Sequence, residues 1–106
     1  MTKLLYFVGS SLKDLRNFPR ASRRKAGYQL DRVQHGLEPS DWRPMKTVGT
    51  RIREIRIHHE GQFRVIYVAR IDNAVHVLHA FQKKTRQTRT QDIAIARQRL
   101  KQVQEK

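Results

Sequence analysis

The chain has 106 residues, with 23 lysines and arginines against 9 acidic residues and a formal net charge of +14. This length suits one small domain with one modest core, and this charge is typical of proteins that bind a polyanion, nucleic acid before an anionic membrane surface. Since the sequence contains no cysteine, disulfide and thiolate chemistry are excluded. No apolar run could span a bilayer, and the N-terminal apolar block is too short for a signal peptide, so we expect a cytoplasmic protein with no membrane partner.

The first third of the chain predicts one strand and two helices. The apolar run Leu4 to Val8 is typical of a buried strand. Ser11 is expected to cap a short helix, Pro19 suits the first turn of the next one, and Gly36 is its natural left-handed stop. The second helix has an apolar stripe at helical spacing, formed by Ala26, Leu30, Val33 and Leu37. Its opposite side is basic and reads as a solvated face, formed by Arg20, Arg23, Arg24 and Lys25.

The remaining two thirds predict a sheet followed by a helix. Residues 38–44 are expected to be a loop containing Trp42, and residues 45–48 a short strand. Three longer strands follow, from Arg51 to His58, from Phe63 to Ile71 and from Ala74 to Gln82. The last helix begins at Thr90 and has an apolar stripe of Ile93, Ala96, Leu100 and Val103. This order predicts one α+β domain over residues 1–106, with a small antiparallel or mixed sheet and helices packed on one face.

The length of the first hairpin loop decides which side chains share a face of the sheet. A two-residue turn at Glu60-Gly61 would mix charged and apolar side chains on both faces. A three-residue loop, residues 59–61 with Gly61 in the left-handed bulge position, instead pairs Arg56 with Arg64 and Ile57 with Phe63. Only this register separates the apolar residues from the arginines, so we predict that Arg56 and Arg64 lie side by side.

A two-residue turn is expected at Asp72-Asn73, because both residues tolerate positive φ. It would pair Arg64 with Phe81 and Ile66 with His79, and it would place Leu78 and Ala80 on the core face with Tyr67. The predicted polar face then gathers Glu54, Arg56, His58, Arg64, His79, Phe81 and Lys83.

Two arginines directly opposite each other destabilise a sheet unless an anion lies near them. The anion can be an RNA phosphate, or it can be Glu54 in an ion network on a solvated face. Guanidinium donors suit the dianionic phosphorane of RNA cleavage. Proton transfer can fall to Lys83 or Lys84, since neighbouring positive charges lower the pKa of a lysine, or to His79 or His58. Glu54 is a weaker base.

The predicted catalytic residues are Arg56, Arg64, Lys83, Lys84, Glu54 and His79. The predicted RNA-binding residues are Lys46, Arg51, Arg53, Phe81, Arg86 and Arg89. The five histidines lack a plausible set of carboxylate or thiolate partners, so we expect no metal and no small-molecule cofactor.

Several stretches match a known family, namely Gly36 to Pro39, Trp42 to Lys46, Glu54 to Ile57, Phe63 to Tyr67 and Leu78 to Thr85. The chain resembles the RelE/ParE superfamily of toxins from bacterial type II toxin–antitoxin pairs, most closely the phage-derived HigB-like branch. The resemblance implies a RelE-like fold and an mRNA endonuclease (an mRNA interferase) that works on the ribosome and inhibits translation. It also implies mRNA and the ribosome as partners, and silencing by a cognate helix-turn-helix antitoxin.

The chain departs from the family pattern at two places. Glu54 stands where some RelE toxins carry a lysine, and no tyrosine follows Lys84. The same fold also supports ParE-type poisoning of DNA gyrase without nuclease chemistry, and a non-catalytic RNA-binding module is a further alternative. The facing arginines and the Lys83-Lys84 pair favour RNA cleavage.

Overall fold

A computed structural model describes residues 2–104; Met1, Glu105 and Lys106 lie outside the described residues. The elements in chain order are β1 (Leu4–Phe7), α1 (Ser11–Arg16), α2 (Arg20–Gln34), β2 (Trp42–Pro44), β3 (Ile52–His58), β4 (Gln62–Ile71), β5 (Ala74–Gln82) and α3 (Thr90–Gln104). The α+β fold with two N-terminal helices and one C-terminal helix is confirmed. That residues 1–106 form one domain stays a prediction.

The strands form one five-stranded mixed sheet in the order β1-β5-β4-β3-β2. β1 is parallel to β5, and every other neighbouring pair is antiparallel. The prediction of a buried first strand was wrong, because β1 lies at the edge of the sheet and leaves Leu4 64% and Tyr6 46% exposed.

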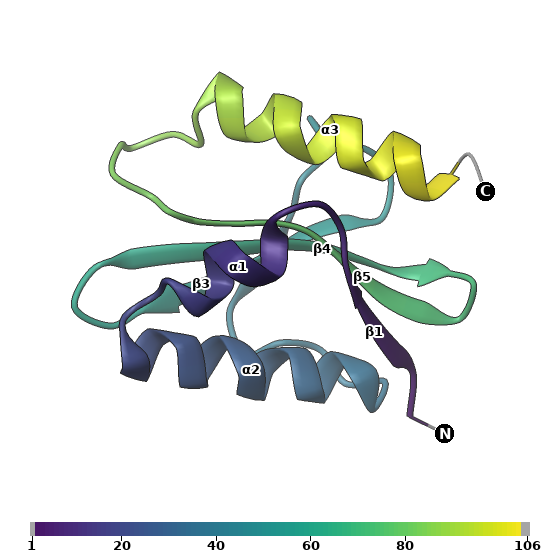
Figure 1. Ribbon diagram of the computed structural model, residues 1–106, viewed down its shortest axis with the longest axis horizontal. Coiled ribbons are helices and arrows are strands. Elements are labelled where there is room, and N and C mark those ends of the chain that lie inside the picture. Colours follow the sequence, from purple (N-terminus) through teal and green to yellow (C-terminus); the bar gives the residue numbers. More distant parts are fainter. Residues whose placement is uncertain (1, 105–106) are drawn as a thin grey trace.

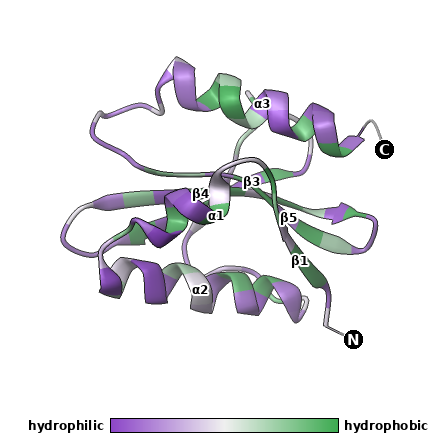
Figure 2. Ribbon diagram, viewed as in Figure 1, coloured by the Kyte–Doolittle hydropathy of each residue, from purple (hydrophilic) through white to green (hydrophobic). Residues whose placement is uncertain are grey.

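Helices cover both faces of the sheet, with α1 and α2 on one side and α3 on the other (Figure 1). Ile55, Val65 and Tyr67 pack with α2, whereas Ile66 and Leu78 belong to a second apolar cluster together with α3. The prediction that all helices share one face was therefore wrong, since the central strands bury apolar side chains on both faces. Figure 2 shows hydrophobic residues concentrated in the strands and a strongly hydrophilic N-terminal half of α2.

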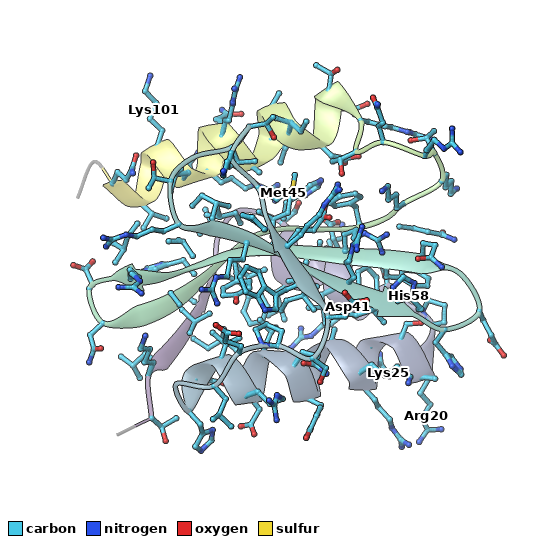
Figure 3. All side chains as sticks on the ribbon, turned by 180° about the vertical axis from the view of Figure 1, so that it is seen from behind. Arg20, Lys25, Asp41, Met45, His58 and Lys101 are labelled. Carbon is cyan, nitrogen blue, oxygen red and sulfur yellow. The ribbon has the colours of Figure 1, made fainter. Side chains whose placement is uncertain are left out.

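The segment around the single tryptophan differs from the prediction. Residues 42–44 form a strand paired with β3, whereas residues 45–48 form a turn closed by the Val48 amide, which donates to the Met45 carbonyl at 3.0 Å. Pro44 is compatible with β2 because this strand is an edge of the sheet. Met45 is buried beneath α3 (Figure 3).

The helix ends correct two further expectations. Ser10, not Ser11, precedes α1, and its hydroxyl bonds the Asp14 carboxylate at 2.8 Å. Ser11 is buried and donates to the Val77 carbonyl. α2 ends before Gly36, which has φ +80° as predicted, so Leu37 lies outside the helix and is 54% exposed.

Both hairpin loops have the predicted lengths, although the first has positive φ at Glu60 as well as at Gly61. The His59–Gly61 loop places His58 opposite Gln62, with positive φ at Glu60 and Gly61. Asp72 and Asn73 have φ of 54° and 52°, as a type I′ turn requires. The register that places Arg56 directly opposite Arg64 is therefore confirmed.

A β-bulge overturns the predicted position of Leu78. Ile66 pairs with His79 and Tyr67 pairs with Val77, so Leu78 is the extra residue on β5. Leu78 packs in the cluster with α3, and it does not share a face with Tyr67 as predicted. Ala80 does lie with Tyr67. A second irregularity nearer the turn compensates for the bulge, which keeps Arg64 opposite Phe81 as predicted.

None of the helices among residues 2–104 is both long enough and apolar enough to cross a membrane.

The Gly61 conformation gives a test of the hairpin. A Cβ at Gly61, where φ is +137°, would lie 3.2 Å from a ring atom of Phe63, so Gly61→Ala should lower the free energy of unfolding by about 1–2 kcal/mol. Gly27→Ala is the control, because a Cβ there meets nothing within 4 Å and should stabilise α2 by about 0.5–1 kcal/mol. Urea unfolding measures both. Equal stability of the Gly61→Ala variant and the wild type would contradict this description of the loop.

Candidate functional site

The candidate site lies on the α3 side of the sheet, beside the apolar contact with that helix. We call the following side chains the charged cluster: Arg43 of β2, Glu54 and Arg56 of β3, Arg64 of β4, and Lys83, which follows β5. The strand register brings them together, since Arg43 pairs with Glu54 and Arg56 pairs with Arg64. Four cations around one carboxylate make this a strongly positive part of the sheet.

Arg64 is the most enclosed cation of the cluster, with 4% of its side chain exposed. Its Nη1 donates to the Phe63 carbonyl at 2.9 Å, which fixes the guanidinium against its own strand. Burial lowers the pKa of Arg64, and the positive charges of Arg56 and Arg43 act in the same direction, whereas Glu54 opposes them. An anion near Arg64 would therefore be favoured strongly.

Glu54 is the internal counter-charge of the cluster and is completely buried. Its Oε1 accepts a hydrogen bond from Nε of Arg43 at 3.0 Å and lies 3.6 Å from Nε of Arg64. Its Oε2 accepts from the Thr88 hydroxyl at 3.2 Å. The ion network considered from the sequence is present in part, but it joins Glu54 to Arg43 and Arg64. With its oxygens occupied in this way, Glu54 is better suited to positioning the arginines than to accepting a proton.

Arg56 is more exposed than Arg64 but shares with it an unpaired donor. Its side chain is half-buried, and its Nε is buried without a hydrogen-bond partner anywhere in residues 2–104. Leaving such a donor unpaired is costly unless a ligand completes it. The cluster thus holds two facing arginines, each with a buried Nε that has no hydrogen-bond partner among residues 2–104, and Arg64 is the more enclosed of the two.

Lys83 extends the cluster beyond the end of β5. Its amide donates to the Gln62 carbonyl at 2.7 Å, which continues the β4–β5 pairing and holds the residue beside Arg64. Burial lowers the pKa of Lys83, and the charges of Arg64, Arg43 and Arg56 lower it further, while Glu54 opposes the shift. A lysine in this position is suited to proton transfer.

His79 faces the same side of the sheet, but it is turned toward α3. Its Nε2 lies 2.8 Å from a carboxylate oxygen of Asp92, its ring stacks on Phe81, and 7% of its side chain is exposed. These contacts fit a residue that holds the first turn of α3 against β5. His58 lies at the edge of the sheet, where Nε2 bonds Asp41 at 2.9 Å (Figure 3).

The predicted RNA-binding residues fall into two groups. Phe81 is half-buried opposite Arg64, and the exposed residues Lys84, Arg86 and Arg89 follow in the segment between β5 and α3. The Thr88 hydroxyl donates to Glu54 and so holds this segment against the charged cluster. We call its exposed cations, Lys84, Arg86 and Arg89, the basic track. Lys46 is exposed in the turn after β2.

Arg51 and Arg53 belong to the second group, on the opposite face of the sheet. They alternate in sequence with Ile52 and Glu54. Both line a cavity together with Tyr67, a β4 residue that packs with α2. The Arg53 guanidinium lies 3.9 Å from the centre of the Trp42 ring. The structure therefore does not bring these two arginines together with Arg56 and Arg64.

Sequence reasoning missed Arg43 and Thr88, which both bond Glu54. Arg43 was overlooked because residues 38–44 were expected to be a loop. A strand at residues 42–44 would have revealed it, since pairing with β3 places Arg43 beside Glu54. The Thr88 contact spans 34 positions and leaves no local pattern. Among residues 2–104, no group of three or more His, Asp or Glu side chains could hold a metal ion.

The five-stranded mixed sheet with its three helices is compatible with a RelE-like fold. Residues 13–101 match the family model of the phage-derived Gp49-like proteins (DUF891), and the chain belongs to this family. It is a RelE/ParE-like toxin family of toxin–antitoxin systems, so an antitoxin is the implied partner. No curated protein matches the chain.

The buried carboxylate gives a test of the charged cluster. Glu54→Gln removes the charge that separates the arginines, so the free energy of unfolding should fall by about 1–3 kcal/mol. Sulfate should restore part of that loss, because a bound anion can take the place of the carboxylate. Urea unfolding in sulfate and in chloride at equal ionic strength measures this effect. The same stability for the variant and the wild type in chloride would contradict the structural role of Glu54.

Proposed function

We propose that this protein is a HigB-like toxin that cleaves mRNA on the ribosome and thereby inhibits translation. The observation that carries the proposal is the pair of facing arginines with Lys83 beside them. A phosphodiester fits such a site because its charge grows during cleavage. The unpartnered Nε atoms of Arg56 and Arg64 support this assignment most directly.

The proposed chemistry divides the work among three side chains. Lys83 takes the proton of the 2′-hydroxyl, the 2′-oxygen attacks the adjacent phosphorus, and the P–O5′ bond breaks. The products are a 2′,3′-cyclic phosphate and a 5′-hydroxyl. Arg56 and Arg64 donate to the non-bridging oxygens, whose negative charge is greatest in the phosphorane. The leaving 5′-oxygen receives its proton either from Lys84 or from a ribosomal group. Slower cleavage by the Lys84→Ala variant would identify Lys84 as the donor.

The basic track supports a ribosome-bound substrate. Lys84, Arg86 and Arg89 are exposed beyond the charged cluster and can contact phosphates that flank the cut. Phe81, half-buried opposite Arg64, is the aromatic side chain of this face that a base could contact. With one partly covered aromatic ring, binding of free RNA should depend mostly on charge, and the ribosome would supply the positioning of the codon.

Removal of Arg56, the more exposed of the two facing arginines, is the direct test of the proposal. Arg56→Ala should reduce cleavage of a reporter mRNA by purified ribosomes and toxin by roughly 100- to 1,000-fold, because a donor to the transition state is lost. Thermal unfolding should change little. Arg24→Ala, an exposed arginine of α2, is the control and should cleave like the wild type.

Two results would contradict the proposal. Undiminished cleavage by Arg56→Ala would remove this residue from the chemistry. Inhibition of gyrase supercoiling by the wild type, without any cut transcript, would favour the ParE-type activity.

The pH dependence of cleavage tests the role of Lys83. A base acts in its neutral form, so the single-turnover rate should rise with pH and level off above the pKa of Lys83, and Lys83→Ala should abolish that limb. Arg43 lowers this pKa and Glu54 raises it. The limb should therefore move to higher pH in Arg43→Ala and to lower pH in Glu54→Gln. A limb unaffected by all three substitutions would exclude Lys83 as the base.

A further inference from the structure

The face of the sheet opposite the charged cluster carries a cavity that the cleavage chemistry does not use. Its volume is about 620 Å³, and it lies between the C-terminal end of α2 and the paired strands β3 and β4. The residues that line it and matter here are Lys3, Leu37, Arg51, Arg53, Tyr67 and Arg70. We call this site the α2 groove.

The α2 groove is basic. Its lining contains four cations, and Glu38 is the single acidic residue of the lining. Lys3 and Arg53 are already engaged, since Nζ of Lys3 donates to the Ala69 carbonyl at 2.8 Å and Arg53 contacts Trp42 and Glu38. Arg51 and Arg70 are exposed at the rim. A ligand of this groove should therefore carry negative charge.

The groove is also partly apolar. Val33 and Ala69 contribute to its lining, and Leu37 is 54% exposed beside them. Leu37 lies just past the left-handed Gly36, whose φ of +80° turns the chain out of α2 and leaves this side chain on the surface. The backbone of Arg51 has φ +65°, which is uncommon for a side chain of this size and holds the residue at the start of β3.

We infer that the α2 groove binds an acidic segment of the antitoxin that also carries an apolar side chain. Acidic groups of the segment pair with Arg51 and Arg70, and the apolar side chain packs on the exposed Leu37. The inference rests on the proposed function only in taking the toxin's own antitoxin as the occupant, and it does not require that mRNA is cleaved.

An acidic peptide fits this groove better than RNA does. RNA recognition uses aromatic faces for base stacking, whereas Tyr67, the aromatic residue of the lining, is 1% exposed. Exposed aliphatic surface beside cations is typical of protein partners with complementary charge. Because the groove and the charged cluster lie on opposite faces of the sheet, an occupant of the groove leaves Arg56 accessible.

Two matched double variants test the inference. Arg70→Glu with Leu37→Glu alters one charged and one apolar residue of the groove. Arg20→Glu with Tyr28→Glu makes the same change in net charge at exposed positions of α2, away from its C-terminal end. The measurement is the Kd of the antitoxin encoded next to the toxin, by fluorescence anisotropy, together with the Kd of a labelled 12-nucleotide single-stranded RNA and ribosomal mRNA cleavage.

The groove variant should bind the antitoxin at least roughly tenfold more weakly than the control variant, because reversed charge at an interface is repulsive. It should bind RNA like the control and should still cleave mRNA. Equal antitoxin affinity of the two variants would overturn the inference. A loss confined to RNA binding would also overturn it, since the groove would then be part of the RNA track. If the wild type cleaves no mRNA but the groove variant loses the antitoxin, the proposed function fails and this inference stands.

Discussion

Arg56 and Arg64 face each other directly across β3 and β4, and the rest of the site is arranged around this unfavourable contact. Glu54 is buried next to this pair. It bonds the guanidinium of Arg43 and lies 3.6 Å from that of Arg64, which makes the pairing of Arg56 with Arg64 tolerable. A single carboxylate cannot neutralise four cations, however, and Nε of Arg56 stays without a partner among residues 2–104. The protein thus keeps a positive site that a phosphate would complete.

The two faces of the sheet have different tasks in this account. One face combines the apolar contact with α3 and the charged cluster, and the segment from Lys83 to Thr90 connects them. The other face holds the main apolar contact with α2 and, at the end of that helix, the α2 groove. Such a division would let a toxin bind its regulator on one face and meet RNA on the other.

The part of the site that follows local rules could be predicted from the sequence. Gly61 and the Asp72-Asn73 pair define the turns, and the turns define which residues of β3, β4 and β5 are neighbours. The predicted pairings of Arg56 with Arg64 and of Arg64 with Phe81 therefore hold despite two irregularities between β4 and β5. The catalytic and RNA-binding roles of these residues stay predictions.

Features set by packing between distant segments could not be predicted. A β-bulge places Leu78 on the other face of the sheet. α3 packs on that face, against the apolar cluster that contains Ile66 and Leu78. The position of Arg43 beside Glu54 could not be predicted, because β2 has only three residues, too few for an alternating pattern. Arg51 and Arg53 have the composition of an RNA-binding segment, but Arg51 precedes β3, Arg53 lies within β3, and both line the cavity on the α2 side.

The central claim is that Arg56 and Arg64 bind one phosphate together. The most direct measurement follows the Nε–Hε signals of the arginines by NMR during titration with a short RNA whose 2′-hydroxyl at the cleavage position is methylated. We expect the signals of Arg56 and Arg64 to shift together with one apparent Kd, while those of Arg51 and Arg53 stay in place. Shifts at Arg51 and Arg53 with none at Arg56 would contradict this account.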